Sequence, residues 1–425
     1  MAEEEVKTGG RRRRPTSGFI PEPADKPSLK PSPRQKRLAK TAPLSLFAIT
    51  APGLEQLAVA ELHELGIAAR AVEGGAAFSG TLHDVGRANL WLRTASRVIA
   101  RIGEFHARSF AELERHAKQQ PWDRFLSRGA DVRLRVTCKK SRLYHSDAVA
   151  ERVAGAIDAR LGSVGVLTLD ESEDDEISHR QTLIVVRVFR DVVTISADTS
   201  GDLLHMRGYR LATVKAPLRE TLAAALITAS GWNSELPLLD PMCGAGTIAI
   251  EGALMARKIA PGLRYGGGTR GFAFFNWPEF DAGRWDAIVA DASGMMLPST
   301  AAPILASDRD AGAIAAAIAN AERAGVAADI ELSERALSAI EPPASPGWLI
   351  TNPPYGVRVG DRDRLRNLYA QLGNVARRKL EGWNLALLSA DESLDRQVGI
   401  PLETVLATKN GGISVRVLRG SVEKS

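Results

Sequence analysis

The 425-residue sequence contains only two cysteines, Cys138 and Cys243, which lie far apart and have no histidines at metal-ligand spacing. A disulfide framework and a zinc site are therefore not expected, and a reducing cytoplasm is the simplest compartment. No apolar run approaches the roughly 18 residues that cross a bilayer. The amino terminus, where Glu3–Glu5 precede an arginine run, lacks the apolar core of a signal peptide. These absences favour a cytoplasmic protein with neither a membrane segment nor a metal site.

Reactive side chains are also scarce where catalysis would need them. No serine or cysteine is placed as a nucleophile, and no general base is offered. None of the seven histidines lies in the loops expected after the strands of the carboxyl-terminal half. The pattern argues against hydrolytic and metal-dependent chemistry.

Excess positive charge is confined to the start of the chain. Residues 1–40 hold 11 of the 55 Lys and Arg and 5 of the 50 Asp and Glu, so their net charge is +6 and that of the rest is −1. With six prolines and a single aromatic residue, Phe19, the segment 1–41 cannot bury enough apolar area to offset its ordering entropy. We expect a disordered basic tail that either adds phosphate affinity or only aids solubility. The folded body must contact any polyanion through a local patch.

Apolar periodicity divides the next part of the chain into two α+β units, at residues 42–104 and 105–200. The elements expected in the first are a strand at 44–49, a helix at 54–65, a strand near 76–78 and a helix near 82–96. Those expected in the second are a strand at 132–136, a helix at 147–161 and a hairpin formed by 183–188 and 192–197. The acidic run 171–176 is expected in a solvated loop.

Strand and helix patterns alternate over residues 201–425, which is typical of a parallel sheet covered by helices. A linker and leading helix occupy 201–235. The expected strands are 236–240, 304–308, 330–333, 348–351, 384–389, 404–409 and 413–417. The last two are joined by Asn410-Gly-Gly, a hairpin signal. An antiparallel pair that closes a parallel sheet predicts an α/β, Rossmann-like class I methyltransferase fold with seven strands.

One segment, residues 261–281, does not fit this alternation. It is rich in aromatic residues, among them Tyr265, Phe272 and Trp277. It could be a substrate-side lid with stacking groups or an insertion packed on the sheet edge, and buried packing is favoured for most of the aromatics.

A glycine-containing turn marks the candidate cofactor site. Asp240 ends an expected strand, and Gly244 and Gly246 follow in the turn that opens the next helix. Such glycines let a ligand approach the backbone closely at a helix amino terminus. Met242 and Thr247, in the same run, are further candidate contacts.

Two cofactors are compatible with this turn. The loose dinucleotide pattern Gly-x-Gly-x-x-Ala makes NAD a competitor. That pattern needs an acid about 20 residues on, whereas Asp308 lies much farther along. An acid before the turn also suits the ammonium of a methionine moiety better than a pyrophosphate. Asp308 would then hold the ribose hydroxyls, Glu334 would lie near the adenine amine, and Thr221 is a candidate contact for the carboxylate, with helix capping as the alternative.

The tetrapeptide Asn352-Pro-Pro-Tyr355 follows a short apolar run and predicts a loop at a strand end. The oxygen of Asn352 and the carbonyl of Pro353 could accept the two hydrogens of an exocyclic base amine. The prolines hold the loop in shape, and Tyr355 could stack on an extruded base. Taken alone, the tetrapeptide is equally compatible with a proline-rich turn.

Linked motifs in matching order resemble bacterial large-subunit ribosomal RNA guanine-N2 methyltransferases that bear a THUMP domain, most closely the amino-terminal methyltransferase half of the fused enzyme. The likeness covers about residues 44–420. It is carried by Leu46–Glu55, Asp198–Arg210, Arg219–Ala225, Asp240–Thr247, Asn352–Gly356 and Gly382–Leu385.

The resemblance implies S-adenosylmethionine as methyl donor and the N2 amine of a guanine in 23S rRNA as acceptor. It also implies a ferredoxin-like subdomain at 42–104 and an RNA-docking THUMP domain at 105–200. The cofactor contacts implied are Asp240, Gly244, Gly246, Asp308, Glu334 and Asn352, and the base clamp implied is Asn352, Pro353 and Tyr355.

The chain departs from the family in three respects. It stops just past its last strand, where the longest members fuse a second methyltransferase. Val357 stands where a glutamate commonly follows the loop, and Ala245 and Glu334 are milder changes.

Five basic residues are candidates for an RNA-binding patch, or for a merely solvated basic loop: Lys139, Lys140, Arg142, Arg207 and Arg210. Three alternative functions remain. A tRNA guanine-N2 methyltransferase would share the chemistry, and a DNA adenine-N6 methyltransferase would use the same clamp but should carry a DNA target-recognition domain. A non-catalytic RNA-binding protein would not need an intact cofactor site.

Overall fold

The structure is a computed structural model that describes residues 1, 43–162, 165–169, 181–211, 218–355 and 362–423. The tail 2–41, the acidic run 171–176 and Val357 lie outside these residues, so the expectations for them stay predictions. Pro43–Ser425 form one compact unit. Of the described helices, none is long and apolar enough to cross a membrane.

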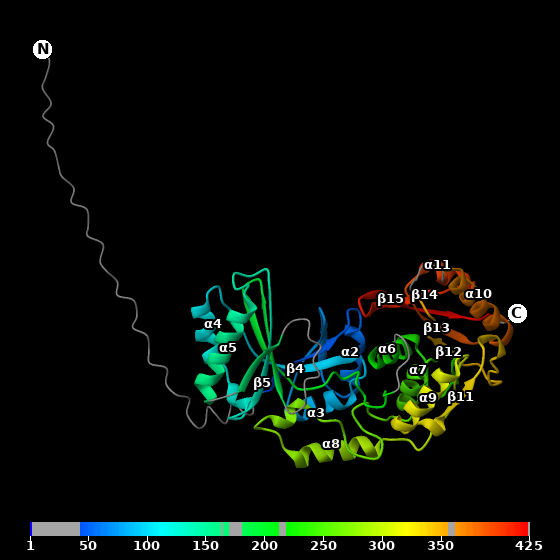
Figure 1. Ribbon diagram of the computed structural model, residues 1–425, viewed down its shortest axis with the longest axis horizontal. Helices are drawn as coiled ribbons and strands as arrows, with labels where there is room; N and C mark the ends of the chain where they lie inside the picture. Colours follow the sequence, from blue (N-terminus) through cyan, green and yellow to red (C-terminus); the bar gives the residue numbers. More distant parts are fainter. Residues whose placement is uncertain (2–42, 163–164, 170–180, 212–217, 356–361, 424–425) are drawn as a thin grey trace. The chain divides into compact units, whose positions relative to one another are not determined.

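The amino-terminal half is built on one mixed sheet of eight strands with helices packed against it (Figure 1). In spatial order the strands are β2 (Ala69–Val72), β3 (Gly75–Gly80), β1 (Leu44–Thr50), β4 (Ala95–His106), β8 (Val192–Asp198), β7 (Thr182–Phe189), β5 (Asp131–Lys139) and β6 (Gly165–Leu169). Its helices are α2 (Glu55–Glu64), α3 (Leu82–Trp91), α4 (Phe110–Lys118), α5 (Ser146–Leu161) and the short η1 (Trp122–Arg124).

The long strand β4 belongs to both units expected in this half. It pairs with β1 on one side and with β8 on the other, so both units share one sheet. The boundary expected at residue 104 falls inside it. The helix expected at 82–96 was too long: it ends at Trp91 because Leu92 already has extended backbone (ψ 122°), and the residues from Ala95 onward pair in the sheet.

The hairpin expected around Arg190-Asp191 is confirmed. These two residues connect β7 to β8 and have φ values of 51° and 63°. Positive φ at both positions is what a two-residue connection of type I′ requires.

The carboxyl-terminal half has the predicted seven-stranded class I sheet. Its strands, in spatial order, are β11 (Ile330–Glu334), β10 (Ile304–Asp308), β9 (Leu238–Asp240), β12 (Trp348–Thr351), β13 (Asn384–Ser389), β15 (Ile413–Ser421) and β14 (Glu403–Asn410). Strand β15 lies antiparallel between β13 and β14. The last two strands thus form the predicted antiparallel pair, and within it β15 is the strand that runs against the parallel direction.

Helices cover both faces of this sheet (Figure 1). They are α6 (Glu220–Ser230), α7 (Thr247–Ala256), α9 (Ala311–Ala324), α10 (Arg362–Lys379), α11 (Glu392–Val398) and the short η3 (Ala327–Asp329) and η4 (Leu337–Ala339). Helix α8 (Ala282–Gly294) and the short η2 (Ala273–Asn276) pack instead on the amino-terminal half. Successive strand residues enter opposite cores: Leu238 packs with α6, α7 and α9, whereas Leu239 packs with α10 and α11. This double burial explains why the central strands are apolar throughout.

The aromatic segment 261–281 packs inward. Phe272, Phe274 and Trp277 are buried in the core of the amino-terminal half, together with Trp285 from α8. Of the three, Phe272 and Phe274 make edge contacts with the Trp285 ring. Tyr265 instead is 74% exposed. The favoured expectation of packing is thus confirmed for these three aromatics, although their partner is the amino-terminal core and not the sheet edge.

Candidate active site

A cavity of about 560 Å³ opens where the adjacent parallel strands β9 and β12 end. It is lined by the strand-end loops, the start of α6 and the β14–β15 turn. The lining residues are Leu218, Arg219, Asp240, Met242, Cys243, Gly244, Ala245, Thr247, Ile248, Asn352, Pro353, Pro354, Tyr355, Asn410, Gly411 and Ile413. Both candidate motifs of the sequence, the glycine turn and the Asn-Pro-Pro-Tyr loop, therefore face one cavity.

Asp240 is a buried carboxylate in the wall of this cavity. Its Oδ1 accepts hydrogen bonds from Thr351 Oγ1 (2.6 Å) and Met242 N (3.3 Å). Its Oδ2 has no partner among the described residues. Burial raises the pKa of Asp240 to about 7; the charge of Asp308 adds to this, and the two hydrogen bonds oppose it. A cationic ligand group would relieve both the burial and the unsatisfied oxygen.

The glycine turn adopts backbone that favours glycine. Gly244 and Gly246 have φ values of 52° and 81°. A Cβ on Gly246 would stand 3.0 Å from the Cβ of Ala317, so a side chain here would also crowd α9. The amide of Gly244 donates to Asp308 Oδ2 (3.0 Å), which ties the end of β10 to the turn.

Four predicted cofactor residues lie outside the cavity lining: Thr221, Gly246, Asp308 and Glu334. Glu334 pairs in register with Asp308 at the end of β11, but it is exposed and outside the lining. Thr221 is 9% exposed on α6 and is not among the lining residues. By contrast, Met242 and Thr247 both line it.

The Asn-Pro-Pro-Tyr loop presents an unsatisfied acceptor. Asn352 Oδ1 is buried and has no hydrogen-bond partner among the described residues. Pro353 is buried and Pro354 exposed. Tyr355 Oη accepts a hydrogen bond from Asn410 Nδ2 (2.9 Å), and burial raises the Tyr355 pKa. The ring is thereby held in one place on the cavity wall, as a stacking surface requires.

Sequence reasoning missed two polar residues of the cavity, Arg219 and Asn410. Asn410-Gly-Gly predicted only a hairpin turn. The turn lies at the cavity because β15 is inserted between β13 and β14 in the sheet. Arg219 begins one of the motifs that carry the resemblance. An arginine in a sequence is, however, most often a solvated surface residue, so its residue type alone did not predict a place in the cavity.

Three of the predicted RNA-contact residues are exposed. Lys139 ends β5, and Lys140 and Arg142 follow in the loop to α5. The loop is held in place by Asp191, whose Oδ1 accepts from Arg142 N (2.8 Å) and whose N donates to Ser141 Oγ (3.1 Å). RNA contact by these three residues stays a prediction, and their exposure and the hydrogen bonds that hold the loop are compatible with it.

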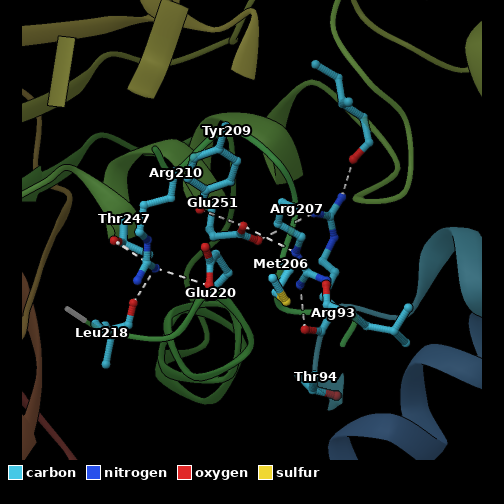
Figure 2. A network of polar contacts seen from close by, with 12 residues as sticks. Arg93, Thr94, Met206, Arg207, Tyr209, Arg210, Leu218, Glu220, Thr247 and Glu251 are labelled. Atoms are coloured by element: carbon cyan, nitrogen blue, oxygen red, sulfur yellow. Dashed lines mark hydrogen bonds and ion pairs between the residues drawn. The ribbon is translucent and has the colours of Figure 1, made fainter. Parts of the chain in front are cut away.

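The other two, Arg207 and Arg210, do not lie on such a surface. Arg207 is 6% exposed; its Nε lies 3.6 Å from Glu251 Oε1, and its Nη2 donates to the carbonyl of Arg93 (Figure 2). Arg210 Nη2 lies 3.1 Å from Glu220 Oε2. Both guanidiniums are therefore committed to buried carboxylates, and we correct their assignment from RNA contact to internal ion pairing.

Family models match three consecutive parts of the chain. An RlmL ferredoxin-like domain matches residues 45–99, a THUMP domain matches 107–198, and an RMKL-like methyltransferase domain matches 207–414.

The chain is also similar to whole relatives. It is 34% identical over 381 residues to a protein of Synechocystis sp. (strain ATCC 27184 / PCC 6803 / Kazusa) named as a provisional RNA methyltransferase, covering 88% of this chain and 95% of that one. It is 35% identical to the ribosomal RNA large subunit methyltransferase K/L of Syntrophotalea carbinolica, covering 89% of this chain. The chain spans 53% of that relative, about half its length.

Solved structures share the fold over most of the chain. SMU.472, a provisional methyltransferase crystallised with SAH, has a TM-score of 0.80 at 27% identity and covers 91% of this chain and 100% of its own. A Listeria monocytogenes protein named as a predicted N6-adenine-specific DNA methylase has a TM-score of 0.77 at 31% identity, covering 90% of this chain and 97% of its own.

Proposed function

This chain belongs to the RMKL-like methyltransferases with RlmL ferredoxin-like and THUMP domains, and we propose that it methylates the N2 amine of a guanine in 23S rRNA. It is an S-adenosylmethionine-dependent RNA methyltransferase; the base, the atom and the RNA species are our proposal. The observation that carries the proposal is the unsatisfied, buried Oδ1 of Asn352 in the same cavity as Asp240.

The residues of the cavity fit S-adenosylmethionine, which supplies an electrophilic methyl group when bound. Asp240 Oδ2, which lacks a partner among the described residues, suits the ammonium of the methionine part. Gly244 lines the cavity and has a positive φ, and a glycine there lets a ligand approach the backbone closely before α7 begins. Asp308 is tied to that turn through Gly244, and in our proposal it binds the ribose hydroxyls.

The Asn-Pro-Pro-Tyr loop suits an exocyclic amine. Such an amine is planar, because its lone pair is delocalised into the ring, and it is held by acceptors on its two hydrogens. Asn352 Oδ1 supplies one acceptor, and the Pro353 carbonyl is the second in our proposal. These acceptors stabilise the positive charge that develops on the nitrogen. Tyr355 holds the extruded base, so orientation contributes to the rate.

We favour guanine in rRNA over its alternatives because of the amino-terminal half and the relatives. The match to a THUMP model supports an RNA target, and the curated K/L relatives are named for the ribosomal large subunit. A tRNA guanine would meet the same clamp. An adenine in DNA would also meet it, and the name of the Listeria structure makes that outcome worth testing directly.

Product analysis tests the proposal. The protein is incubated with methyl-labelled S-adenosylmethionine and, separately, with 23S rRNA, tRNA and duplex DNA, and each nucleic acid is digested to nucleosides. We expect label in N2-methylguanosine from 23S rRNA alone. Label in tRNA would show that tRNA, and not 23S rRNA, is the substrate. Label in N6-methyladenine would overturn the proposed target base and target atom. No transfer to any nucleic acid would overturn the assignment as a methyltransferase.

We further propose that the loop after β5 docks RNA through Lys139, Lys140 and Arg142. An aromatic group belongs to the same loop: Tyr144 is 68% exposed and its ring lies 4.0 Å, centroid to centroid, from that of His145. Exposed aromatic rings beside lysine and arginine stack on unpaired bases in RNA-binding proteins.

Alanine variants separate the two kinds of contact. Lys140→Ala and Arg142→Ala should each weaken RNA binding and reduce the slope of log K against log salt by about 1. Tyr144→Ala should weaken it by about 1–3 kcal/mol with the slope unchanged, because stacking releases no counterions. Arg284→Ala on α8, an exposed arginine, is the control. Equal RNA affinity in all four variants would remove this loop from the docking surface.

A further inference from the structure

The lining of the cavity carries one pair of opposite charges. Among the lining residues that the structure describes, Asp240 is the one acidic side chain and Arg219 the one basic side chain. The methionine part of S-adenosylmethionine is a zwitterion, with an ammonium and a carboxylate on the same carbon. Asp240 Oδ2 has no partner among the described residues and could accept from the ammonium. Arg219 is then the cation that the cavity offers to the carboxylate.

Arg219 occupies a position where an arginine does not serve the helix. It is the N-cap residue of α6 and makes no side-chain capping bond. Good N-caps are serine, threonine, aspartate and asparagine, because their side chains accept a hydrogen bond, which a guanidinium cannot do. The side chain is exposed, and it is paired with none of the carboxylates in the described ranges. Arg219 is thus a cation at the cavity wall without a structural role in its own helix.

Arg210 contacts both residues that flank Arg219 (Figure 2). Arg210 Nη2 donates to the carbonyl of Leu218, the preceding residue, and lies 3.1 Å from Oε2 of Glu220, the following residue. The same nitrogen lies 3.4 Å from Thr247 Oγ1 at the start of α7. One guanidinium therefore joins the turn that carries Arg219 to the helix that begins at the glycine turn.

The surroundings of Arg219 are electropositive. The pKa of His205 is lowered to about 4, first by burial and then by the charges of Arg219, Arg207, Arg210 and Arg270. His205 is thus neutral at pH 7 and adds no charge of its own. Arg207 and Arg210 are paired with the buried carboxylates of Glu251 and Glu220, which leaves Arg219 as the cation available to a ligand.

We propose that Arg219 binds the carboxylate of the methionine part of S-adenosylmethionine, opposite Asp240, and that Arg210 positions it. Arg219 thereby takes the role that the sequence pattern had suggested for Thr221, which lies two residues on and outside the lining. The inference rests on the donor assignment made above. A protein that binds no S-adenosylmethionine would overturn that assignment, whereas the experiments below concern Arg219 alone.

Calorimetric titration of the full chain with two ligands tests the proposal. One ligand is S-adenosylmethionine, and the other is its decarboxylated form, which keeps the ammonium and sulfonium groups. Arg219→Ala should raise the Kd for S-adenosylmethionine about 10- to 100-fold, the loss typical of a hydrogen bond between charged groups. The Kd for the decarboxylated ligand should stay within about twofold or fall, because a guanidinium only repels that ligand. Arg219→Lys should give an intermediate Kd, and Arg284→Ala is the matched control.

Three results would overturn the proposal. The first is an unchanged Kd for S-adenosylmethionine. The second is an equal loss for both ligands, which would mean that Arg219 only shapes the wall. The third is a loss of RNA affinity with donor affinity intact, which would mean that the guanidinium binds a phosphate of the RNA.

The role of Arg210 is tested by combining variants. Arg210→Lys keeps a charge, but the lysine side chain is one bond shorter and its nitrogen falls short of the position from which Arg210 Nη2 contacts Leu218, Glu220 and Thr247. It should raise the Kd for S-adenosylmethionine in the parent protein and have little further effect in Arg219→Ala, because it acts through Arg219. Losses that add independently would show that Arg210 does not act through Arg219. If Arg210→Lys fails to fold, the two-ligand comparison with Arg219→Ala still decides the binding role.

Discussion

Replacing Asn352 by alanine is expected to lower kcat about 10²- to 10³-fold while changing the Kd for S-adenosylmethionine less than about threefold. The reason is that Asn352 Oδ1 meets no donor among the described residues and gains one only from the substrate amine. Single-turnover methylation of RNA and calorimetry with the donor measure the two quantities separately. The variant should also unfold at the same or a higher temperature, since a buried, unsatisfied oxygen costs about 1–3 kcal/mol.

Asn410→Ala is the matched control for this variant. It removes the same type of side chain from the same cavity, but Asn410 donates to Tyr355 rather than offering an acceptor to the amine. Its loss in kcat should be much smaller. A large loss of donor affinity in Asn352→Ala, with kcat at saturating donor intact, would mean that the loop binds the cofactor and not the base.

Replacing Asp240 by asparagine is expected to raise the Kd for S-adenosylmethionine about 100-fold or more, because the ligand ammonium loses its buried counter-charge. In the parent protein this Kd should rise as the pH falls below about 7, since Asp240 is then protonated before the ligand binds. The asparagine variant should lack this dependence. Persistence of the same pH profile in the variant would assign the titration to another group.

The same substitution should stabilise the ligand-free protein. The folded-state pKa of Asp240 is raised, so its contribution to the free energy of unfolding is present below pH 3.8 and is lost as the pH rises to about 7. That loss is at most about 4 kcal/mol. Asparagine carries no charge to desolvate, and its Oδ1 can still accept from Thr351 and Met242. Thermal unfolding at pH 8 should therefore occur at a higher temperature in Asp240→Asn, and the difference should shrink toward pH 4.

Most of the fold was predictable because its signals are local. The central strands are short apolar runs, and the glycines and prolines that end them mark the loops. The end of α3 was misplaced because no glycine or proline separates the helix from β4. Helix α8 was not predicted, since its three buried side chains, Trp285, Ile288 and Ala292, are too few to give a clear stripe.

The site residues that stand at the ends of strands could be predicted from the sequence. Those that reach the site, or are withdrawn from the surface, through tertiary packing could not. Asp240 and Asn352 each stand at the end of an apolar strand, and parallel strands bring their ends together. Asn410 reaches the cavity only through the antiparallel insertion of β15, which no local pattern reveals. Arg207 and Arg210 looked like solvated basic residues because composition cannot show the carboxylates that face them. A lone glutamate, Glu251, in the otherwise apolar helix α7 was the available sign of a buried ion pair.

That ion pair limits how modular the protein can be. Glu251 is fully buried, and Arg93 Nη1, contributed by the loop between α3 and β4, lies 3.9 Å from its Oε2. Arg93 also donates to the carbonyl of Ile259 just beyond α7, and its backbone amide binds Glu61 of α2. Stripping one partner from a buried pair costs about 3–5 kcal/mol. A methyltransferase half cut at residue 207 would carry Glu251 without Arg93. Exchanging docking domains between relatives therefore requires that the incoming domain also carry an arginine in the loop between α3 and β4.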